Sequence, residues 1–420
     1  MTSGGHSSSG QSENSGHNGK FDIDDNIITH FIQMRSSGGI VLMVAAALAI
    51  ICANSPLAPF YNDLLSVPVQ VRIGDMGIDK PVLLWINDGL MAIFFFYVGL
   101  ELKRDFVEGE LSEPKKIVLP AVGAVGGMAI PALVYVFFTL DNNPEALSGW
   151  AIPVATDIAF AIGILALLGS DVPQSLRIFL TSLAIFDDIG AIIIIALFYT
   201  EDISITALIF VAACIPFLYI LNRYRIESKS VFVLMGLFMW VAMLKSGVHA
   251  TLTGVIVAFF VPMQSRHDPS VSPLKLLEDD LNHAVAFIVL PVFAFTNAGI
   301  HILNLSLEEA LHRVPVGIAM GLFMGKQIGV FGFCWLFIRL KLAEMPRGMT
   351  WGTLYGSAIL CGVGFTMSLF IGSLAFDAGT DRDFDERLGI IAGSLVSGVV
   401  GYLVLRYHLK KSGNGSQASG

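Results

Sequence analysis

The sequence predicts an all-α polytopic membrane protein, and three observations support this fold class. The chain of 420 residues is 54% hydrophobic, it is only 14% charged, and its mean hydropathy is +0.71. A soluble domain carries about 25% charged residues. Many of the apolar runs also reach about 20 residues, the length that an α-helix needs to cross a bilayer. We therefore expect a chain whose main partner is membrane lipid.

Both ends of the chain are expected to lie outside the membrane domain. Residues 1–34 begin with a Ser/Gly/His/Asn segment of low complexity, and we predict a disordered cytoplasmic tail there. Residues 409–420 have a similar composition and are predicted to form a second disordered cytoplasmic tail. The membrane domain is then residues 35–408.

The distribution of Lys and Arg decides how many spans this domain has. Apolar runs of sufficient length begin near Gly39, Leu83, Ile117, Trp150, Leu176, Ile203, Ala284, Val314, Trp351 and Leu388. The stretch 231–262 is interrupted by "KSGVH" and is either one long span or two short spans. Two short spans place eighteen of the 25 basic residues on the side of both termini, against six on the other side, whereas one long span reduces the bias to thirteen against ten. The positive-inside rule therefore favours twelve transmembrane helices with both termini cytoplasmic.

One external loop, residues 67–79, has the sequence "VPVQVRIGDMGID". Its alternating apolar residues before a Gly-containing turn predict a small β-hairpin. We expect the hairpin to be a contact between subunits, and an ordered loop without that role is the alternative.

Residues 117–199 and 314–405 each contain three spans with an interrupted middle member. The first interruption, "AIPVATDIAF", contains Pro153, which removes a backbone donor. The second, "ILCGVGFTMS", contains Gly362 and Gly364. Twelve spans give the two triads opposite orientations, and inverted repeats with interrupted helices are typical of secondary transporters whose ion site lies near the midplane.

Four ionisable groups lie near the middle of these predicted spans: Asp157, Asp187, Asp188 and Lys326. Each costs about 2.5–3.5 kcal/mol to insert, so the set is not expected by chance. A buried Asp–Lys pair that only holds helices together is an alternative for one pair. It does not account for three carboxylates and one lysine, and a carboxylate that faces a cavity would bind a cation or a proton.

Adjacent helical positions point about 100° apart, so one aspartate of the pair can face Lys326 while the other faces a cavity. Carboxylate, hydroxyl and carbonyl oxygens suit a hard cation, here a monovalent one. A proton and a cation that compete for the same oxygens predict antiport by mutual exclusion, which is transport and not enzymatic catalysis.

Several long motifs resemble the NhaA family of bacterial sodium/proton antiporters over about residues 35–408: "ATDIAFAIGILALLGS", "FDDIGAIIIIALFYT", "LKSGVHATLTGV", "LPVFAFTNAG", "GKQIG" and "CGVGFTMSLFI". The resemblance implies a protein of the bacterial cytoplasmic (inner) membrane in which the two interrupted helices cross. It implies pH-regulated, electrogenic exchange of cytoplasmic Na⁺ or Li⁺ for external H⁺ by alternating access, with two protons per Na⁺. It also implies no cofactor and a homodimer formed partly through a hairpin like 67–79.

The resemblance further assigns roles to residues of the site. Asp187 and Asp188 would bind the cation and the protons, with Asp188 the principal Na⁺ ligand. Lys326 would pair with Asp187. Thr156 and Asp157 would compensate the ends of the crossed half-helices, Asp157 mainly by its charge.

A pH response is implied for Glu101, Asp105, His249 and Glu278. Asp105 replaces the Glu of the familiar pattern, and Asp279 and Asn282 replace residues that are often histidines in the family. For His249, a satisfied interfacial side chain without a role in the pH response is the alternative.

Composition and motifs argue against other classes of function. The net charge is −9 and no basic cluster indicates a nucleic-acid partner. The four cysteines have no CxxC spacing that would favour a metal site or a disulfide. An intramembrane aspartyl protease would need a GxGD motif and aspartates on two helices, and a cation channel would need a pore-lining ring or filter and no buried lysine.

Overall fold

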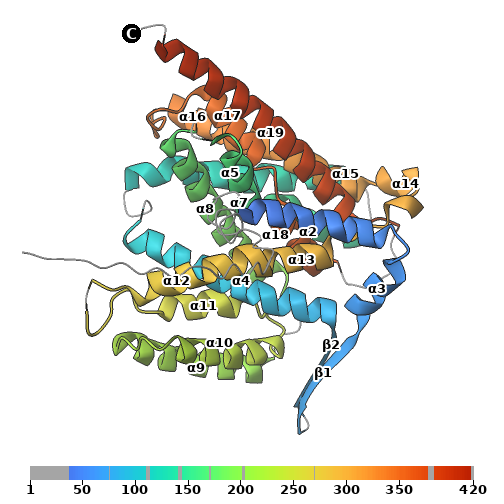
Figure 1. Ribbon diagram of the computed structural model, residues 1–420, viewed down its shortest axis with the longest axis vertical. Helices are drawn as coiled ribbons and strands as arrows, with labels where there is room; N and C mark the ends of the chain where they lie inside the picture. The colour runs from blue at the N-terminus through green and yellow to red at the C-terminus, as the bar shows by residue number, and fades with distance from the viewer. Residues whose placement is uncertain are drawn as a thin grey trace, which may run out of the picture.

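The computed structural model describes residues 37–74, 76–109, 114–140, 144–169, 172–200, 204–268, 270–376 and 383–417, and the predicted tail 1–34 lies outside these ranges. The described chain is mostly helical with one small antiparallel sheet (Figure 1). Helices are expected in lipid, because each one satisfies its own backbone hydrogen bonds. Seven described helices are long and apolar enough to span a membrane, or up to nine if each bent pair is one span. The prediction of a polytopic helical membrane protein is confirmed at this level.

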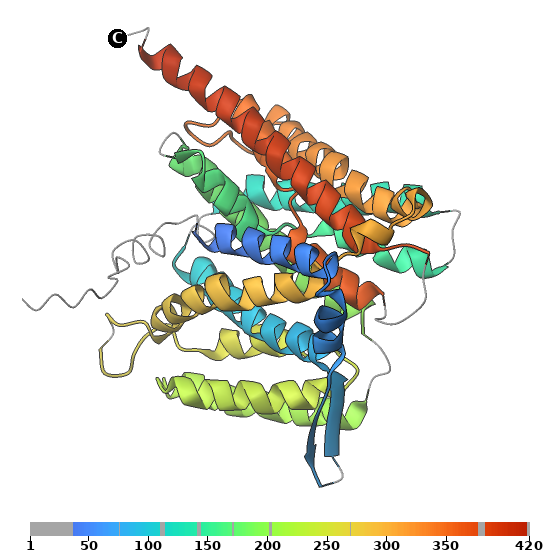
Figure 2. The same cartoon turned by 45° about the vertical axis from the view of Figure 1, so that its right-hand side comes forward.

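The helices pack in two groups, which form the lower and upper parts of Figures 1 and 2. The first, which we call the α4 group, comprises α4 (Val82–Val107), α9 (Ile205–Arg223), α10 (Lys229–Leu244), α11 (Leu252–Phe260), α12 (Pro273–Ala284), the π-helical turn η4 (Val285–Val289) and α13 (Leu290–Asn297). The stretch 231–262 thus contains two helices, α10 and α11, with a turn between them.

The second group, which we call the α8 group, surrounds the aspartate pair. It comprises α5 (Pro114–Thr139), α6 (Pro144–Leu147), η2 (Ser148–Val154), α7 (Ile158–Ala166), α8 (Gln174–Phe198), α15 (Arg313–Met320), η6 (Gly321–Gly325), η7 (Gln327–Phe331), α16 (Gly332–Arg339), α17 (Trp351–Leu360), α18 (Phe365–Ala375) and α19 (Glu386–Gln417). Helix α19 includes much of the segment 409–420 that we predicted to be a disordered tail. Its hydrogen bonding continues from the preceding apolar turns through the poor helix formers Gly and Ser.

Helix α2 (Ser37–Ala53) lies between the two groups and packs against α13 and α7. It bends by 110° into α3 (Ala58–Ser66), and the short elements η5 (Ile302–Asn304) and α14 (Leu307–Ala310) follow α13. Gly39 lies against Gly163 of α7, where a Cβ on Gly39 would be only 3.1 Å from the Gly163 Cα. The missing side chains allow these two backbones to approach.

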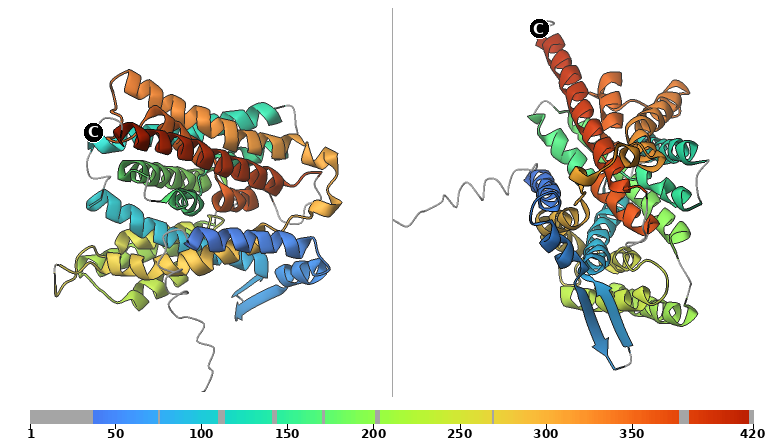
Figure 3. Two further views of the ribbon diagram at one scale, coloured as in Figure 1. Left: turned by 45° about the horizontal axis from the view of Figure 1, so that its top comes forward. Right: turned by 90° about the vertical axis from the view of Figure 1, so that its right-hand side faces the viewer.

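The predicted hairpin is confirmed. Strand β1 (Pro68–Ile73) pairs antiparallel with β2 (Met76–Pro81), and both project from the body of the molecule (Figure 3). Lys80 forms an ion pair with Asp88 of α4 at 2.8 Å, and the Trp85 indole donates to the Val69 carbonyl at 3.0 Å. We call this end of the bundle the hairpin end, and the opposite end, where α12 contacts α4, the Glu278 end.

Both predicted helix interruptions are present and they contact each other. One lies between η2 and α7, and the other lies between α17 and α18, which are bent by 41°. The Asp157 backbone N–H donates to the Val363 carbonyl at 2.7 Å, so one break lies directly against the other. Two sets of half-helix ends therefore meet inside the α8 group.

The helix that carries Lys326 is irregular, which the sequence did not lead us to expect. The π-helical turns η6 and η7 flank Lys326 on both sides. The same stretch crosses α5 closely, because a Cβ on Gly329 would lie 2.1 Å from the Gly126 carbonyl oxygen. Such turns are frequent at functional sites.

Candidate ion site

The structure brings Lys326 and Asp187 together as a fully buried ion pair. The Lys326 Nζ lies 2.8 Å from Asp187 Oδ2, and both side chains have 0% exposure. Lys326 also donates to the Thr156 hydroxyl at 2.9 Å, and that hydroxyl contacts both Asp187 Oδ2 and, at 3.0 Å, the Cys361 carbonyl. Since the hydroxyl has one proton, it donates to one of these two oxygens at a time. The other carboxylate oxygen of Asp187, Oδ1, is buried and has no hydrogen-bond partner among the described residues.

Asp188 takes no part in this ion pair. It is buried, with 2% exposure, and the charged groups that act on it are Asp187, Glu101, Asp157 and Lys326. The part of the chain that the structure describes provides no ion pair or hydrogen bond to its carboxylate, and the nearby Lys326 Nζ bonds to Asp187 and Thr156 instead. A buried carboxylate without a partner is costly, which makes Asp188 the group that gains most from a cation or a proton.

Asp157 joins the ends of two half-helices. Its Oδ1 accepts from the Phe160 N–H at 3.0 Å in the first turn of α7, and its Oδ2 accepts from the Thr366 N–H at 2.9 Å in the first turn of α18. The Thr366 hydroxyl adds a bond of 2.6 Å to Oδ2. Both helix N-termini carry partial positive charge, so one carboxylate neutralises two of them. Asp157 is therefore fully engaged, unlike Asp188.

Three of the four residues predicted for the pH response converge on one guanidinium, that of Arg104. Its Nε lies 3.0 Å from Asp105 Oδ1, its Nη2 lies 4.0 Å from Glu101 Oε1, and its Nη1 contacts Glu278 Oε1. Glu101 also acts electrostatically on Asp188. The cluster therefore lies at the Glu278 end of the bundle, and one of its members acts electrostatically on the site.

Glu278 lies on α12, before the span predicted to begin at Ala284. Burial raises the pKa of its carboxyl above the ordinary value of 4.5, and Arg104 offsets only part of this rise. Its Oε2 has no hydrogen-bond partner in the described chain. Glu278 therefore releases its proton closer to neutral pH than an exposed glutamate does.

His249 lies apart from this cluster, on the turn between α10 and α11, where its carbonyl accepts from the Leu252 N–H at 3.2 Å. Two residues that the structure places at the charged groups, Arg104 and Thr366, were not predicted from the sequence. Arg104 stands in the sequence between Glu101 and Asp105, and its acidic neighbours could have indicated it. For Thr366 no signal in the sequence pointed to Asp157, which is 209 positions away.

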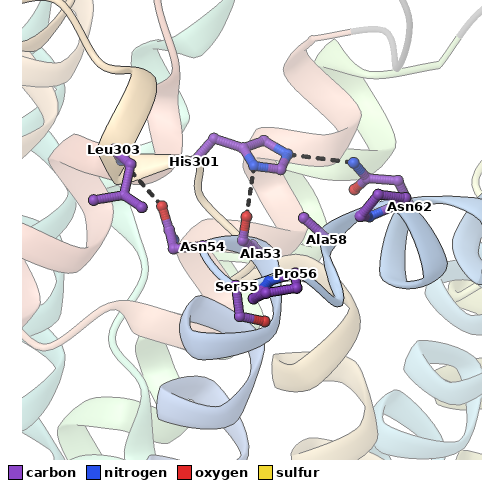
Figure 4. Close-up of a pocket in the computed structure, with 9 residues that line it drawn as sticks. Ala53, Asn54, Ser55, Pro56, Ala58, Asn62, His301 and Leu303 are labelled. Atoms are coloured by element: carbon purple, nitrogen blue, oxygen red, sulfur yellow. Dashed lines mark hydrogen bonds between the residues drawn. The ribbon is translucent and has the colours of Figure 1, made fainter.

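The described residues contain no group of three or more His, Cys, Asp and Glu side chains that could hold a metal ion. One pocket lies at the bend between α2 and α3, where His301, Asn54 and Asn62 line it (Figure 4). It contains neither aspartate of the pair and belongs to the hairpin end.

Comparison with known proteins gives a consistent result. Residues 29–405 match the family model described as Na+/H+ antiporter 1. The chain is 57% identical over 390 residues to the Na(+)/H(+) antiporter NhaA 3 of Saccharophagus degradans, which covers 92% of this chain and 98% of that protein. It is 56% identical to the Na(+)/H(+) antiporter NhaA of Psychrobacter cryohalolentis, covering 92% and 96%, and 57% identical to that of Desulfotalea psychrophila, covering 89% and 94%. The relatives are named as transporters and not as enzymes.

Proposed function

Because the chain belongs to the Na+/H+ antiporter 1 family, we propose that it exchanges cytoplasmic Na⁺ or Li⁺ for external H⁺ by alternating access. Two protons enter per Na⁺, so each cycle moves one net charge. The single observation that carries the proposal is the unequal pairing of the adjacent aspartates. Asp187 is neutralised by Lys326, and Asp188 is buried with no such partner.

In the proposed cycle, Asp188 is the principal cation ligand and Asp187 contributes when its pair with Lys326 opens. The Thr156 hydroxyl and the carbonyls freed at the helix breaks are oxygen donors beside these carboxylates. A cation and a proton cannot occupy the same carboxylate oxygens together, so binding of one displaces the other. Na⁺ and Li⁺ are substrates here.

We also propose twelve spans with inverted repeats at 117–199 and 314–405, in the bacterial inner membrane with both termini cytoplasmic. The Glu278 end is then cytoplasmic and the hairpin end external. The hairpin forms part of a homodimer contact, supported by its exposed Val67, Val69 and Val71 side chains. The cluster of Glu101, Asp105 and Glu278 around Arg104 sets the pH range of transport, while His249 contributes separately.

The test is Na⁺-driven proton movement in proteoliposomes for wild type and Asp188→Asn. The amide cannot exchange a proton and carries no charge, so the variant should lose at least about 100-fold of the rate, within the range of a key charged group. Asp63→Asn, an exposed position on α3, is the matched control and should transport normally. Wild-type Na⁺ affinity and turnover in Asp188→Asn would refute the assignment of the cation site.

A further inference from the structure

We infer that Arg387 is a positioning residue that latches the two helix groups together at the hairpin end, and that its bond to Gly299 opens when the ion site opens there. The inference rests on the proposed alternating access. Arg387 lies in the first turn of α19, in the α8 group, and its Nη1 donates to the Gly299 carbonyl at 3.0 Å. Gly299 directly follows α13, in the α4 group.

The donor side of this contact is held in place. Arg387 Nε and Nη2 form a two-pronged bond with Asp385, at 2.8 Å to Oδ1 and 2.7 Å to Oδ2. The start of α19 is itself fixed against α15, since a Cβ on Gly389 would lie 2.2 Å from the Pro315 carbonyl oxygen. Because Nε and Nη2 of the guanidinium bind Asp385 in this bidentate way, Nη1 remains as a donor, and it donates to the Gly299 carbonyl.

The acceptor side is equally fixed, to the corner between α2 and α3. A Cβ on Gly299 would lie 2.4 Å from the Tyr61 hydroxyl, which donates to the Phe295 carbonyl at 2.7 Å. The following residues are tied down by Asn54, which donates to the Ile300 carbonyl at 2.6 Å, and by His301, whose Nδ1 lies 2.8 Å from the Ala53 carbonyl (Figure 4). The bond from Arg387 to Gly299 therefore joins the start of α19 to the segment that is held against the corner between α2 and α3.

The position of this contact suggests what it controls. The two groups also meet where the buried rings of Phe95 on α4 and Phe293 on α13 pack on Phe370 of α18, with ring centroids 5.7 and 6.4 Å from that of Phe370. Charged groups lie towards the other end, where Glu101 of α4 acts electrostatically on Asp188 and its carboxylate lies 4.0 Å from the Arg104 guanidinium. This is the arrangement of a site closed at the hairpin end. Opening that end separates α4 and α13 from α18, and the bond between α19 and Gly299 resists this separation.

A hydrogen bond from a charged group is worth about tenfold or more in an equilibrium constant. Arg387→Gln should therefore shift the equilibrium towards the state open at the hairpin end. The apparent KM for Na⁺ should rise about two- to tenfold at the Glu278-end face and fall at the hairpin-end face, because apparent affinity scales with the population of the competent state. Arg387→Lys keeps the charge but cannot bind Asp385 and Gly299 in the same fork, so an intermediate effect is expected.

The experiment measures KM at each face in vesicles of known orientation, together with hydrogen–deuterium exchange of the full chain in nanodiscs. Arg387→Gln should speed exchange at residues 298–303 and 385–390. Arg406→Gln, at the other end of α19, is the control and should match wild type in both measurements. Asp385→Asn, which frees the donor without removing it, provides a second test should Arg387→Gln fail to fold.

Equal KM changes at both faces, or unchanged exchange at both segments, would overturn the latch. Failure of the proposed function is distinguishable from this result. In that case the wild type itself shows no Na⁺-driven proton movement, whatever the variants do. A purely structural contact would lower the melting temperature of Arg387→Gln and leave the ratio of the two KM values unchanged, which also refutes the inference.

Discussion

Asp187 and Asp188 show how one helical step separates two identical side chains chemically. Neighbouring helical positions are rotated by about 100°, and Asp187 pairs with Lys326 whereas Asp188 does not. Replacing one of these three residues is therefore expected to disturb one specific interaction.

Lys326→Gln should destabilise the folded protein, because it leaves Asp187 buried without its cation. Removal of one partner from a buried ion pair costs about 3–5 kcal/mol. Thermal unfolding in detergent, followed by tryptophan fluorescence, should show a lower melting temperature than wild type. Lys410→Gln, an exposed position on α19, serves as the control. An unchanged melting temperature for Lys326→Gln would mean that the pair contributes no net stability.

Glu278→Gln should change how stability depends on pH. The raised pKa of Glu278 means that its contribution to stability is complete below the ordinary pKa of 4.5 and is lost as the pH rises through the raised value. Glutamine does not titrate, so the variant does not lose this stability as the pH rises. It should therefore gain stability relative to wild type between about pH 5 and pH 8. Melting temperatures of both proteins, measured across that pH range, test whether the variant is the more stable one.

The exposed Glu344→Gln should give no such trend. In transport assays the pH midpoint of Glu278→Gln should shift while the maximal rate remains. Complete loss of transport at every pH would instead place Glu278 in the ion pathway, and a melting-temperature difference independent of pH would contradict the burial argument.

At the scale of elements, the helix around Lys326 depends on glycines for its position. A Cβ on Gly325 would lie 2.7 Å from the Pro131 Cα, and one on Gly321 would lie 2.8 Å from the Pro153 Cβ. These close approaches bring the π-helical turns against α5 and the first helix break, and so bring Lys326 to Asp187. The register of this crossing decides whether the ion pair can form.

Gly329→Ala should push this helix away from α5, because the added methyl group would meet the Gly126 carbonyl oxygen. We expect a loss of about 1–3 kcal/mol in unfolding free energy and a slower rate of exchange. Gly332→Ala, three positions further on the same chain, has no atom within 4 Å of its Cβ position and should be neutral. Melting temperature and Na⁺-driven proton flux for this pair test the crossing, and equal behaviour of the two variants would contradict it.

At the scale of the whole molecule, the two helix groups share a boundary that runs past the ion site. Asp187, Lys326 and Asp157 belong to the α8 group, whereas Glu101 and Glu278 belong to the α4 group. Movement of one group against the other would thus carry the charged site relative to the Arg104 cluster and the Arg387 contact.

Transport should respond to voltage. One net charge per cycle gains about 2.3 kcal/mol per 100 mV, so a membrane potential of that size should change the equilibrium Na⁺ gradient about 50-fold. Na⁺-driven proton flux, with and without a potential clamped by valinomycin and K⁺, measures this. Flux that is indifferent to voltage would exclude two protons per Na⁺.

The class of protein, the interrupted helices and the hairpin could be predicted from the amino-acid sequence, and the carboxylates and the lysine stand out there as charges inside apolar segments. These features are local: hydrophobic runs, Pro and Gly positions, and charges inside apolar segments are visible without knowing what packs against them. Their rarity in a membrane made the signal strong, since each intramembrane charge is costly.

Most pairings between distant residues became visible only in the folded chain. Thr366 reaches Asp157 from 209 positions away, Glu278 meets Arg104 from 174 positions away, and Arg387 meets Gly299 from 88 positions away. The π-helical turns beside Lys326 also depend on packing, because close glycine contacts with α5 decide where the backbone must widen. A sequence pattern shows which face of a segment can be buried. Which residues then meet across two distant helices depends on how the helices cross, and the crossing depends on the shapes of both helix surfaces.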